Sequence, residues 1–159
     1  MIMKKNILHQ TVLLILFSII FNSLTAQIIS EKVKSEIIEA LKLWNAAAKN
    51  SNVDQFMSLY DNTDNIMLIG SDTAEIWKGK DKIRGHLTES FAHYSISWKM
   101  DRIDIDYNGG TAWVFVDGLM IINTDKGETI KNPYRFTGIL IKKSGVWKWR
   151  LFHGSIPQV

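Results

Sequence analysis

The sequence contains no cysteine. This absence excludes disulfides, thiolate metal sites, thiol-based catalysis and attachment through a lipidated cysteine. The sequence also has no internal repeat, no low-complexity stretch and no linker. A single domain with a sizeable hydrophobic core is therefore the expected organisation.

A strong excess of charge is absent as well. The formal net charge of +3 includes Lys4 and Lys5, and subtracting these two leaves about +1 for the rest of the chain. The remaining lysines are scattered. Nucleic-acid-binding domains usually gather basic residues on one face, so we expect no nucleic-acid partner.

The chain has no hydrophobic run long enough to span a bilayer comfortably. The run TVLLILFSIIF, at residues 11–21, has eleven residues, whereas a membrane-spanning helix needs about 20. MIMKK gives it a positive start, and the small, polar stretch NSLTAQ follows. This order is typical of a secretory signal. We expect residues 1–26 to be a signal peptide cleaved after Ala26 and residues 27–159 to be exported without a stable membrane anchor. An uncleaved anchor is the alternative.

Three helices are expected in the first part of the mature chain. Apolar residues recur every three or four positions over residues 30–50, over 51–61, where Ser51 and Asp54 resemble a capping box, and over 80–94. NIMLIG, at residues 65–70, reads as a short buried strand. Helices followed by a run of strands are typical of an α+β domain.

From Ser95 the apolar period becomes two, which predicts strands. A change of phase near Asp101 predicts a bulge. NGG at residues 108–110 predicts a tight turn, and TAWVFVDGLMIINT, apolar on both faces, predicts a central strand. A last hairpin is expected around Ser144 and Gly145.

The stretches LWNAAAKNSNVDQFMSLYD, WKGKDKIRGHL and YRFTGILIKKSGVWKWRLFHGSIP give the chain a resemblance to the nuclear-transport-factor-2-like superfamily, in particular its SnoaL-like members. The resemblance implies three N-terminal helices packed on a strongly curved, mainly antiparallel sheet, a cone-shaped α+β barrel with a pocket at its wide end. It implies no single activity, because the superfamily includes enzymes and binding modules. The tyrosine and the acid of its ketosteroid isomerase members are absent, since Trp44 and the acid-free NIMLIG stand at their positions.

The residues that face this pocket follow from the strand phases. Lys142 and Lys148 are expected to face solvent. That places Arg135, Thr137, His153 and Ser155 on the concave face, in one row with Trp147 and Trp149 as core residues. A three-residue turn with left-handed Gly145 sets Arg135 opposite His153. A two-residue turn is disfavoured because it sets Lys142 against Trp147.

The candidate ligand-binding residues are Arg135, Thr137, His153, Ser155, Asp117, Tyr60, Trp44 and Trp113, and His153 is also the catalytic candidate. Each has a structural alternative. His153 could be a buried structural histidine, Arg135 could pair with a carboxylate, and Asp117 could sit at a bulge or edge. Tyr60, Trp44 and Trp113 could be core residues.

A small, partly apolar molecule is the expected partner, and Arg135 favours an anionic group on it. His86 and His93 are read as surface residues, and neither a metal nor a cofactor is expected. The leading interpretation is an exported small-molecule-binding domain. One alternative is a dehydratase-like lyase or isomerase with His153 as acid and base and with Arg135 or Tyr134 polarising an oxygen. Another is a homodimerising interaction domain.

Overall fold

The computed structural model describes residues 30–157, so the expected signal peptide lies outside the described residues. The described residues divide into two units, residues 30–36 and residues 37–157. Of the first unit, residues 30–36 are helical.

Residues 37–157 form three helices and six strands. The helices are residues 37–49, α2 (Val53–Ser58) and α3 (Lys80–His93). The strands are β1 (Met67–Ile69), β2 (Ile76–Lys78), β3 (Tyr94–Asn108), β4 (Thr111–Thr124), β5 (Thr129–Lys143) and β6 (Val146–Ser155). All three expected helical regions are confirmed. The second helix is capped by Asn52, whose side chain accepts from the Gln55 N–H, rather than by the expected Ser51.

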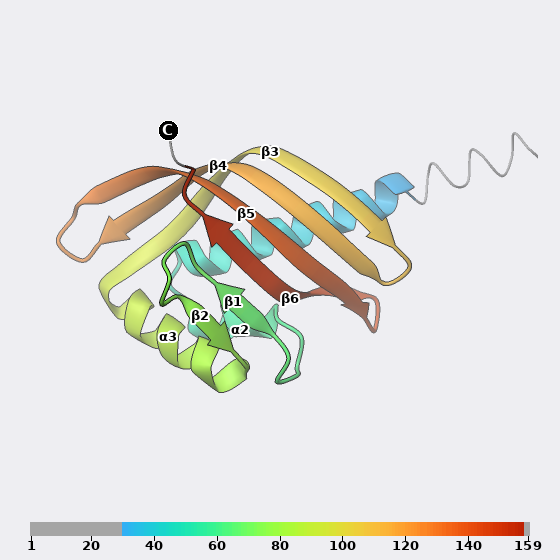
Figure 1. Cartoon of the computed structure of the whole chain (residues 1–159), viewed down its shortest axis with the longest axis horizontal. Coiled ribbons are helices and arrows are strands. Elements are labelled where there is room, and N and C mark those ends of the chain that lie inside the picture. The colour runs from blue at the N-terminus through green and yellow to red at the C-terminus, as the bar shows by residue number, and fades with distance from the viewer. Residues whose placement is uncertain (1–29, 158–159) are drawn as a thin grey trace, which may run out of the picture. The chain divides into compact units, whose positions relative to one another are not determined.

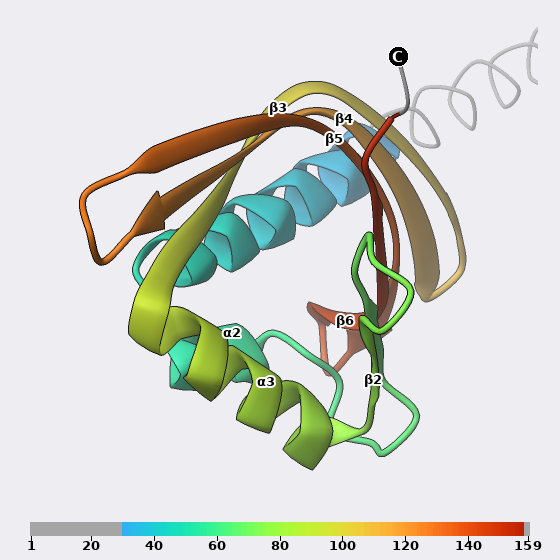
Figure 2. The same cartoon turned by 60° about the vertical axis from the view of Figure 1, so that its left-hand side comes forward.

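The six strands form one open, mixed sheet in the order β2-β1-β6-β5-β4-β3. The β1–β6 pair is parallel, and the other neighbours are antiparallel. The long strands curve around the helix of residues 37–49 (Figure 1), and α2 and α3 lie on the other side of that helix (Figure 2). The expected α+β architecture of helices packed on a strongly curved sheet is confirmed.

The bulge in β3 and the turn between β3 and β4 follow the sequence prediction. The β3–β4 register shifts between Met100 and Arg102, so Asp101 is the bulge residue. Gly109 and Gly110 form the turn that joins Asn108 to Thr111, with Gly109 at φ 57°. β4 is the strand between β3 and β5, as its apolar faces predicted.

The last hairpin differs from the prediction in its register. Lys143 pairs with Val146, so the turn has two residues, Ser144 (φ 49°) and Gly145 (φ 81°). Positive φ at both positions suits the tight hairpin turn that matches strand twist. Lys142 does stand opposite Trp147. Its Nζ lies 5.4 Å from the centre of the Trp147 ring, so the stem covers apolar surface while the half-buried side chain keeps its charge out of the core.

A second, unexpected bulge reverses the faces of β6. Leu140 pairs with Trp149 and Ile139 with Leu151, which leaves Arg150 without a partner position. Trp147 and Trp149 are buried, as predicted, but beyond Arg150 the buried positions are Phe152 and Gly154. One inserted residue therefore turns His153 and Ser155 to the opposite face.

The core is an aromatic cluster centred on Trp44. Its ring stacks on Trp98 at 4.3 Å and contacts Trp149, Phe152 and Phe56 at 4.9, 5.1 and 5.3 Å between centroids. These contacts join the helix of residues 37–49 to the sheet and to α2. Asn45 adds a polar tie, because its side chain donates to the Trp98 carbonyl and accepts from the Trp98 N–H, both at 2.8 Å.

Candidate functional site

The row of polar residues expected inside the pocket lies on the outer face of the sheet. Arg135, Thr137, His153 and Ser155 are all exposed, while Tyr134, Phe136 and Leu140, which alternate with them in β5, are buried. Arg135 faces Ser155, and Thr137 faces His153. The predictions that these four residues line the pocket and that Arg135 opposes His153 are wrong. The structural alternative of a buried His153 is wrong as well.

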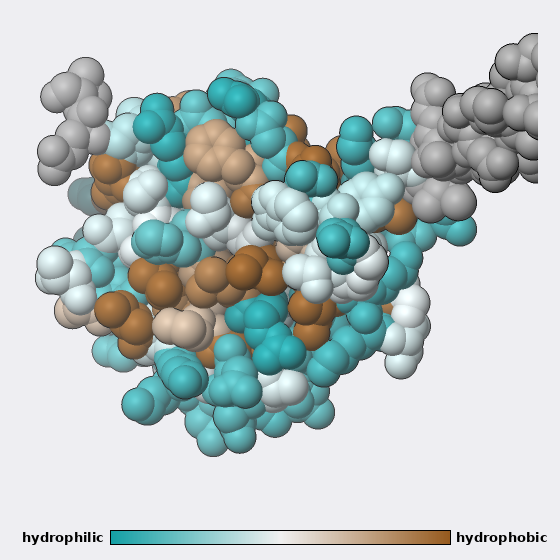
Figure 3. Space-filling view, turned by 45° about the vertical axis from the view of Figure 1, so that its right-hand side comes forward, coloured by the Kyte–Doolittle hydropathy of each residue, from teal (hydrophilic) through white to brown (hydrophobic). Residues whose placement is uncertain are grey.

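Asp117 belongs to the same outer face. Its Oδ1 accepts from the Arg135 Nε at 3.0 Å, and the two residues pair across β4 and β5. The alternative that Arg135 pairs with a carboxylate on the sheet is therefore confirmed, and Asp117 is not a pocket residue. Trp113 is also on this face with 47% of its surface exposed, so neither the core nor the pocket interpretation of Trp113 is correct. In the view of Figure 3, hydrophobic residues form a band across a face that is otherwise mostly hydrophilic.

Tyr60 and Trp44 are buried, as the core interpretation predicted. Burial raises the pKa of the Tyr60 hydroxyl, and the Trp44 indole opposes that rise. Trp44 also lines an inner cavity, whereas Tyr60 does not. Of the eight candidates, Trp44 is thus the one that the structure places at the cavity between helices and sheet.

The inner cavity has a volume of about 140 Å³ and is walled mainly by apolar and aromatic side chains. Helices and sheet both contribute to it. The apolar wall includes Phe56, Leu68, Leu87, Phe91, Trp98 and Phe152. Four polar side chains, Glu75, His86, Tyr94 and Tyr134, also line it. An apolar enclosure with a few polar groups is the usual make-up of a small-molecule site.

Glu75 is fixed in the loop that joins β1 to β2. Its Oε2 accepts from the N–H groups of Ser71 and Asp72 at 2.7 and 2.9 Å. A Cβ at Gly70 would collide with this side chain, so glycine leaves room for the carboxylate where the loop closes over it. The carboxylate is thereby held in one place on the cavity wall.

His86 reaches the cavity from α3. Its ring stacks on Trp77 of β2, and its Nδ1 lies 3.4 Å from the Ser90 Oγ. Burial lowers the pKa of His86, and the charges of Glu75 and Glu89 oppose the change. The neutral imidazole is therefore favoured, which can both donate and accept a hydrogen bond. The expectation that His86 is a surface residue is wrong.

Tyr134 reaches the cavity from the inner face of β5. Its hydroxyl lies against Gly154, where a Cβ would clash with it. Burial and the negative charge of Glu75 raise the pKa of Tyr134 to about 12, against the opposing effect of the Ser71 side chain. Tyr134 therefore stays protonated near neutral pH and can donate a hydrogen bond.

Trp98 offers a further donor. It lines the cavity, and its Nε1 is buried with no hydrogen-bond partner among residues 30–157. A buried donor without an acceptor costs about 1–3 kcal/mol. An acceptor on a bound molecule would remove that cost.

Among residues 30–157, no three histidine, aspartate or glutamate side chains gather as metal ligands would.

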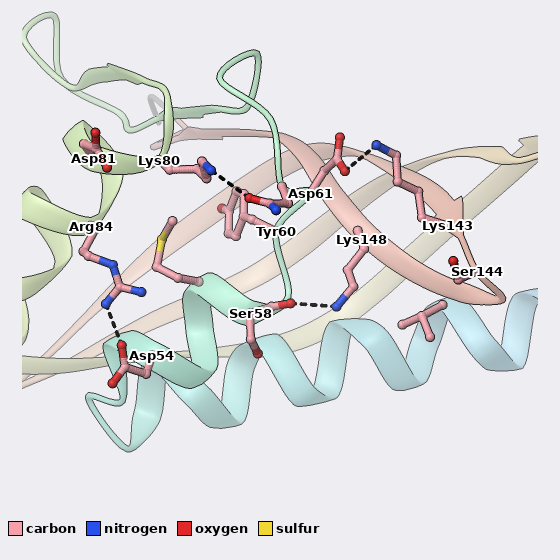
Figure 4. A pocket seen from close by; sticks show the side chains of 13 residues that line it. Asp54, Ser58, Tyr60, Asp61, Lys80, Asp81, Arg84, Lys143, Ser144 and Lys148 are labelled. Carbon is pink, nitrogen blue, oxygen red and sulfur yellow. Dashed lines mark hydrogen bonds and ion pairs between the residues drawn. The ribbon is translucent and has the colours of Figure 1, made fainter.

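A second, larger depression of about 710 Å³ opens on the surface beside α2, α3 and the β5–β6 turn (Figure 4). Its charged groups are largely satisfied by one another. Arg84 bonds Asp54 at 2.6 Å, Lys143 bonds Asp61 at 2.7 Å, and Lys148 donates to the Ser58 carbonyl at 2.7 Å. Because these side chains already have partners, the inner cavity is the better candidate site.

Asp61, at the edge of this depression, has a structural role. Its side chain is 1% exposed, and Lys143 Nζ and Arg150 Nη2 lie 2.7 and 2.9 Å from its two carboxylate oxygens. Burial opposes ionisation of Asp61. The hydrogen bond and charge of Lys143, with the charge of Arg150, outweigh burial and lower its pKa. Asp61 thus fastens the β5–β6 hairpin to the segment that follows α2.

Residues 37–158 match the family of the SnoaL-like domain. The chain belongs to the SnoaL-like domain family. This membership confirms the resemblance on which the cone-shaped fold was predicted. None of the curated proteins compared with the chain matches it. No helix among residues 30–157 is long and apolar enough to cross a membrane.

Solved structures of this fold superpose on most of the chain. A proposed dehydratase of the NTF2-like family from Streptomyces avermitilis has a TM-score of 0.73 at 13% identity, covering 82% of this chain and 99% of that one. An NTF2-like superfamily protein from Salmonella enterica has a TM-score of 0.72 at 17% identity, covering 82% and 94%. A ketosteroid isomerase-like protein from Erwinia carotovora has a TM-score of 0.64 at 16% identity, covering 79% and 96%. At these identities the likeness shows the fold alone.

Sequence reasoning missed Glu75 and the inward position of His86. Glu75 lies beside a three-residue strand, too short to carry a period. His86 falls three residues after Ile83 and one before Leu87, both buried on α3, so the helical spacing did contain a signal for its inward face. Tyr134 was considered only as an alternative to Arg135.

Proposed function

We propose that this SnoaL-like domain binds a small, partly apolar molecule in the inner cavity. The observation that carries the proposal is the aromatic enclosure of about 140 Å³ with four polar side chains on its wall. An apolar cavity of about 150 Å³ is large enough to hold benzene. The body of the ligand is therefore about one ring in size.

The test is thermal unfolding in the presence of small ring compounds, compared between two variants of β4. Met120 lines the cavity, and its neighbour Leu119 does not. Met120→Trp should fill the cavity and abolish ligand-induced stabilisation, which in the wild type should rise with the logarithm of ligand concentration. Leu119→Trp should retain it. Equal responses of the two variants would place binding elsewhere.

We propose that the protein acts outside the cytoplasm, in the periplasm or the extracellular medium. The support is the order of Lys4 and Lys5, the apolar run of residues 11–21 and the small residues that end at Ala26. N-terminal sequencing of the protein from its native host tests this. A mature chain that begins at Gln27 is expected, and an intact Met1 in a membrane fraction would contradict it.

A lyase or isomerase is the second candidate, and one observation favours it. His86 and Tyr134 share the cavity, so a neutral imidazole could take a proton while a phenol donates to an oxygen. His153 is on the outer face and cannot serve there. A turnover that His86→Gln abolishes and His153→Gln preserves would support this candidate. The reverse pattern would exclude it.

A further inference from the structure

The charges around the inner cavity are not those that the sequence suggested. Arg135, which was expected to favour an anion, is on the outer face. Among the described residues that line the cavity there is no lysine and no arginine, and Glu75 is the one aspartate or glutamate. The wall therefore carries a single acidic group and no basic side chain other than His86, whose neutral form burial favours.

The carboxylate of Glu75 is positioned to meet a ligand. Oε2 is held by two backbone N–H groups. Glu75 is half-buried and lines the cavity. A carboxylate at an apolar wall is costly unless a donor or a positive charge accompanies it. A cationic group on a bound molecule would supply both.

The aromatic wall suits a cation as well. Trp77, Phe91, Trp98 and Phe152 all line the same cavity as Glu75. The faces of aromatic rings attract ammonium groups, and rings gathered around a site are a recurrent means of binding them. An aromatic enclosure with one fixed carboxylate is thus selective for positive charge and unfavourable to a second negative charge.

We propose that the inner cavity selects a small arylalkylamine, with its ammonium group at Glu75 and its ring among the aromatic side chains, and that it discriminates against carboxylates of the same size. This inference rests on the proposed function and names the ligand class of that site. It reverses the anionic preference predicted from the sequence.

Three compounds with one ring and different charge test the inference by calorimetric titration: benzylamine, benzyl alcohol and benzoate. Near neutral pH the wild type should bind benzylamine about tenfold more tightly than the alcohol, a ratio equivalent to about 1.4 kcal/mol. Benzoate should bind more weakly than the alcohol. A preference for benzoate, or equal binding of amine and alcohol, would overturn the inference and leave the binding cavity itself supported.

Variants separate the role of the charge from that of the fold. Glu75→Gln should remove the preference for the amine and leave affinity for the alcohol nearly unchanged. Glu89→Gln is the matched control, because Glu89 is exposed, close enough to influence His86, and outside the cavity lining. If Glu75→Gln does not fold, the ranking of the three compounds on the wild type still decides the question. Failure of all three to bind the wild type would overturn both the inference and the proposed ring-sized site.

Discussion

The imidazole of His86 lies flat on the indole of Trp77, with ring centroids 3.5 Å apart and planes inclined by 14°. This stack joins α3 to the edge strand β2, and both rings line the inner cavity. His86 is consequently withdrawn from water on the side of Trp77. Its charge state and the local packing are therefore coupled.

We expect His86 to titrate below the ordinary histidine pKa of about 6.5, because burial lowers its pKa. A depressed pKa in the folded state means that the unfolded chain binds more protons. The stabilising contribution is therefore complete above about pH 6.5 and is lost as the pH falls through the folded pKa. Titration of the His86 ring by NMR, with His86→Gln to assign the signal, measures this. A pKa above the ordinary value would contradict the burial argument.

We expect the two faces of the sheet to differ sharply in their tolerance of tryptophan removal. Trp149 is fully buried at 0% exposure, and truncation of such a core aromatic costs about 3–5 kcal/mol. Trp113 is on the outer face, where truncation should cost under about 1 kcal/mol. Chemical denaturation of Trp149→Ala and Trp113→Ala compares them, with Trp149→Phe as a milder substitute. Equal losses would show that the assigned faces are wrong.

We expect Asp61→Asn to lower the free energy of unfolding by about 1.5–3 kcal/mol, the usual range for a hydrogen bond to a charged group. Because the pKa of Asp61 is lowered, the wild-type advantage should be present above about pH 4 and should disappear as the pH falls through the folded value. Denaturation at several pH values measures it. Asp54→Asn is the control, since the Asp54–Arg84 pair is exposed and should contribute about 0–1 kcal/mol.

The homodimer remains a prediction, and the outer face of the sheet is where it can be tested. Trp113 is exposed on the same face as the ion pair of Asp117 and Arg135, a combination that could meet a second copy of itself. Light scattering across concentrations should show a mass that Trp113→Arg reduces. Leu43→Arg, at another exposed apolar position, should not change it. A monomer at all concentrations would contradict the prediction.

The elements that could be predicted from the sequence are those with local signals. The Asp101 bulge was visible because apolar residues change from even to odd positions around it. The Arg150 bulge was not visible, because Leu151 and Phe152 are both apolar and either one satisfies an inward position. The predicted face of residues 151–155 was therefore inverted, and with it the predicted site.

The predicted register of the last hairpin is wrong because the cost of placing Lys142 opposite Trp147 is smaller than expected. Lysine is rarely found in a core, which is why the pattern favours a register that separates the two residues. In the structure, the ammonium group of Lys142 lies over the indole ring of Trp147, 5.4 Å from its centre. A pattern of apolar and polar positions gives the face of a lysine, but it does not show whether the ammonium group is buried or extends along the surface. Trp44, by contrast, was predicted as core correctly, because helical spacing alone gives its face.

The bulge at Arg150 decides which side chains of β6 face the interior. If Arg150 instead took the position opposite Ile139, strict alternation would rotate residues 151–155 by half a turn. His153 and Ser155 would then enter the interior, and Phe152 would leave it. In the structure Arg150 pairs with the buried carboxylate of Asp61, and Leu151 takes the position opposite Ile139. A change in the pairing of one residue could thus exchange an apolar lining for a polar one, without a substitution among the residues that would change sides.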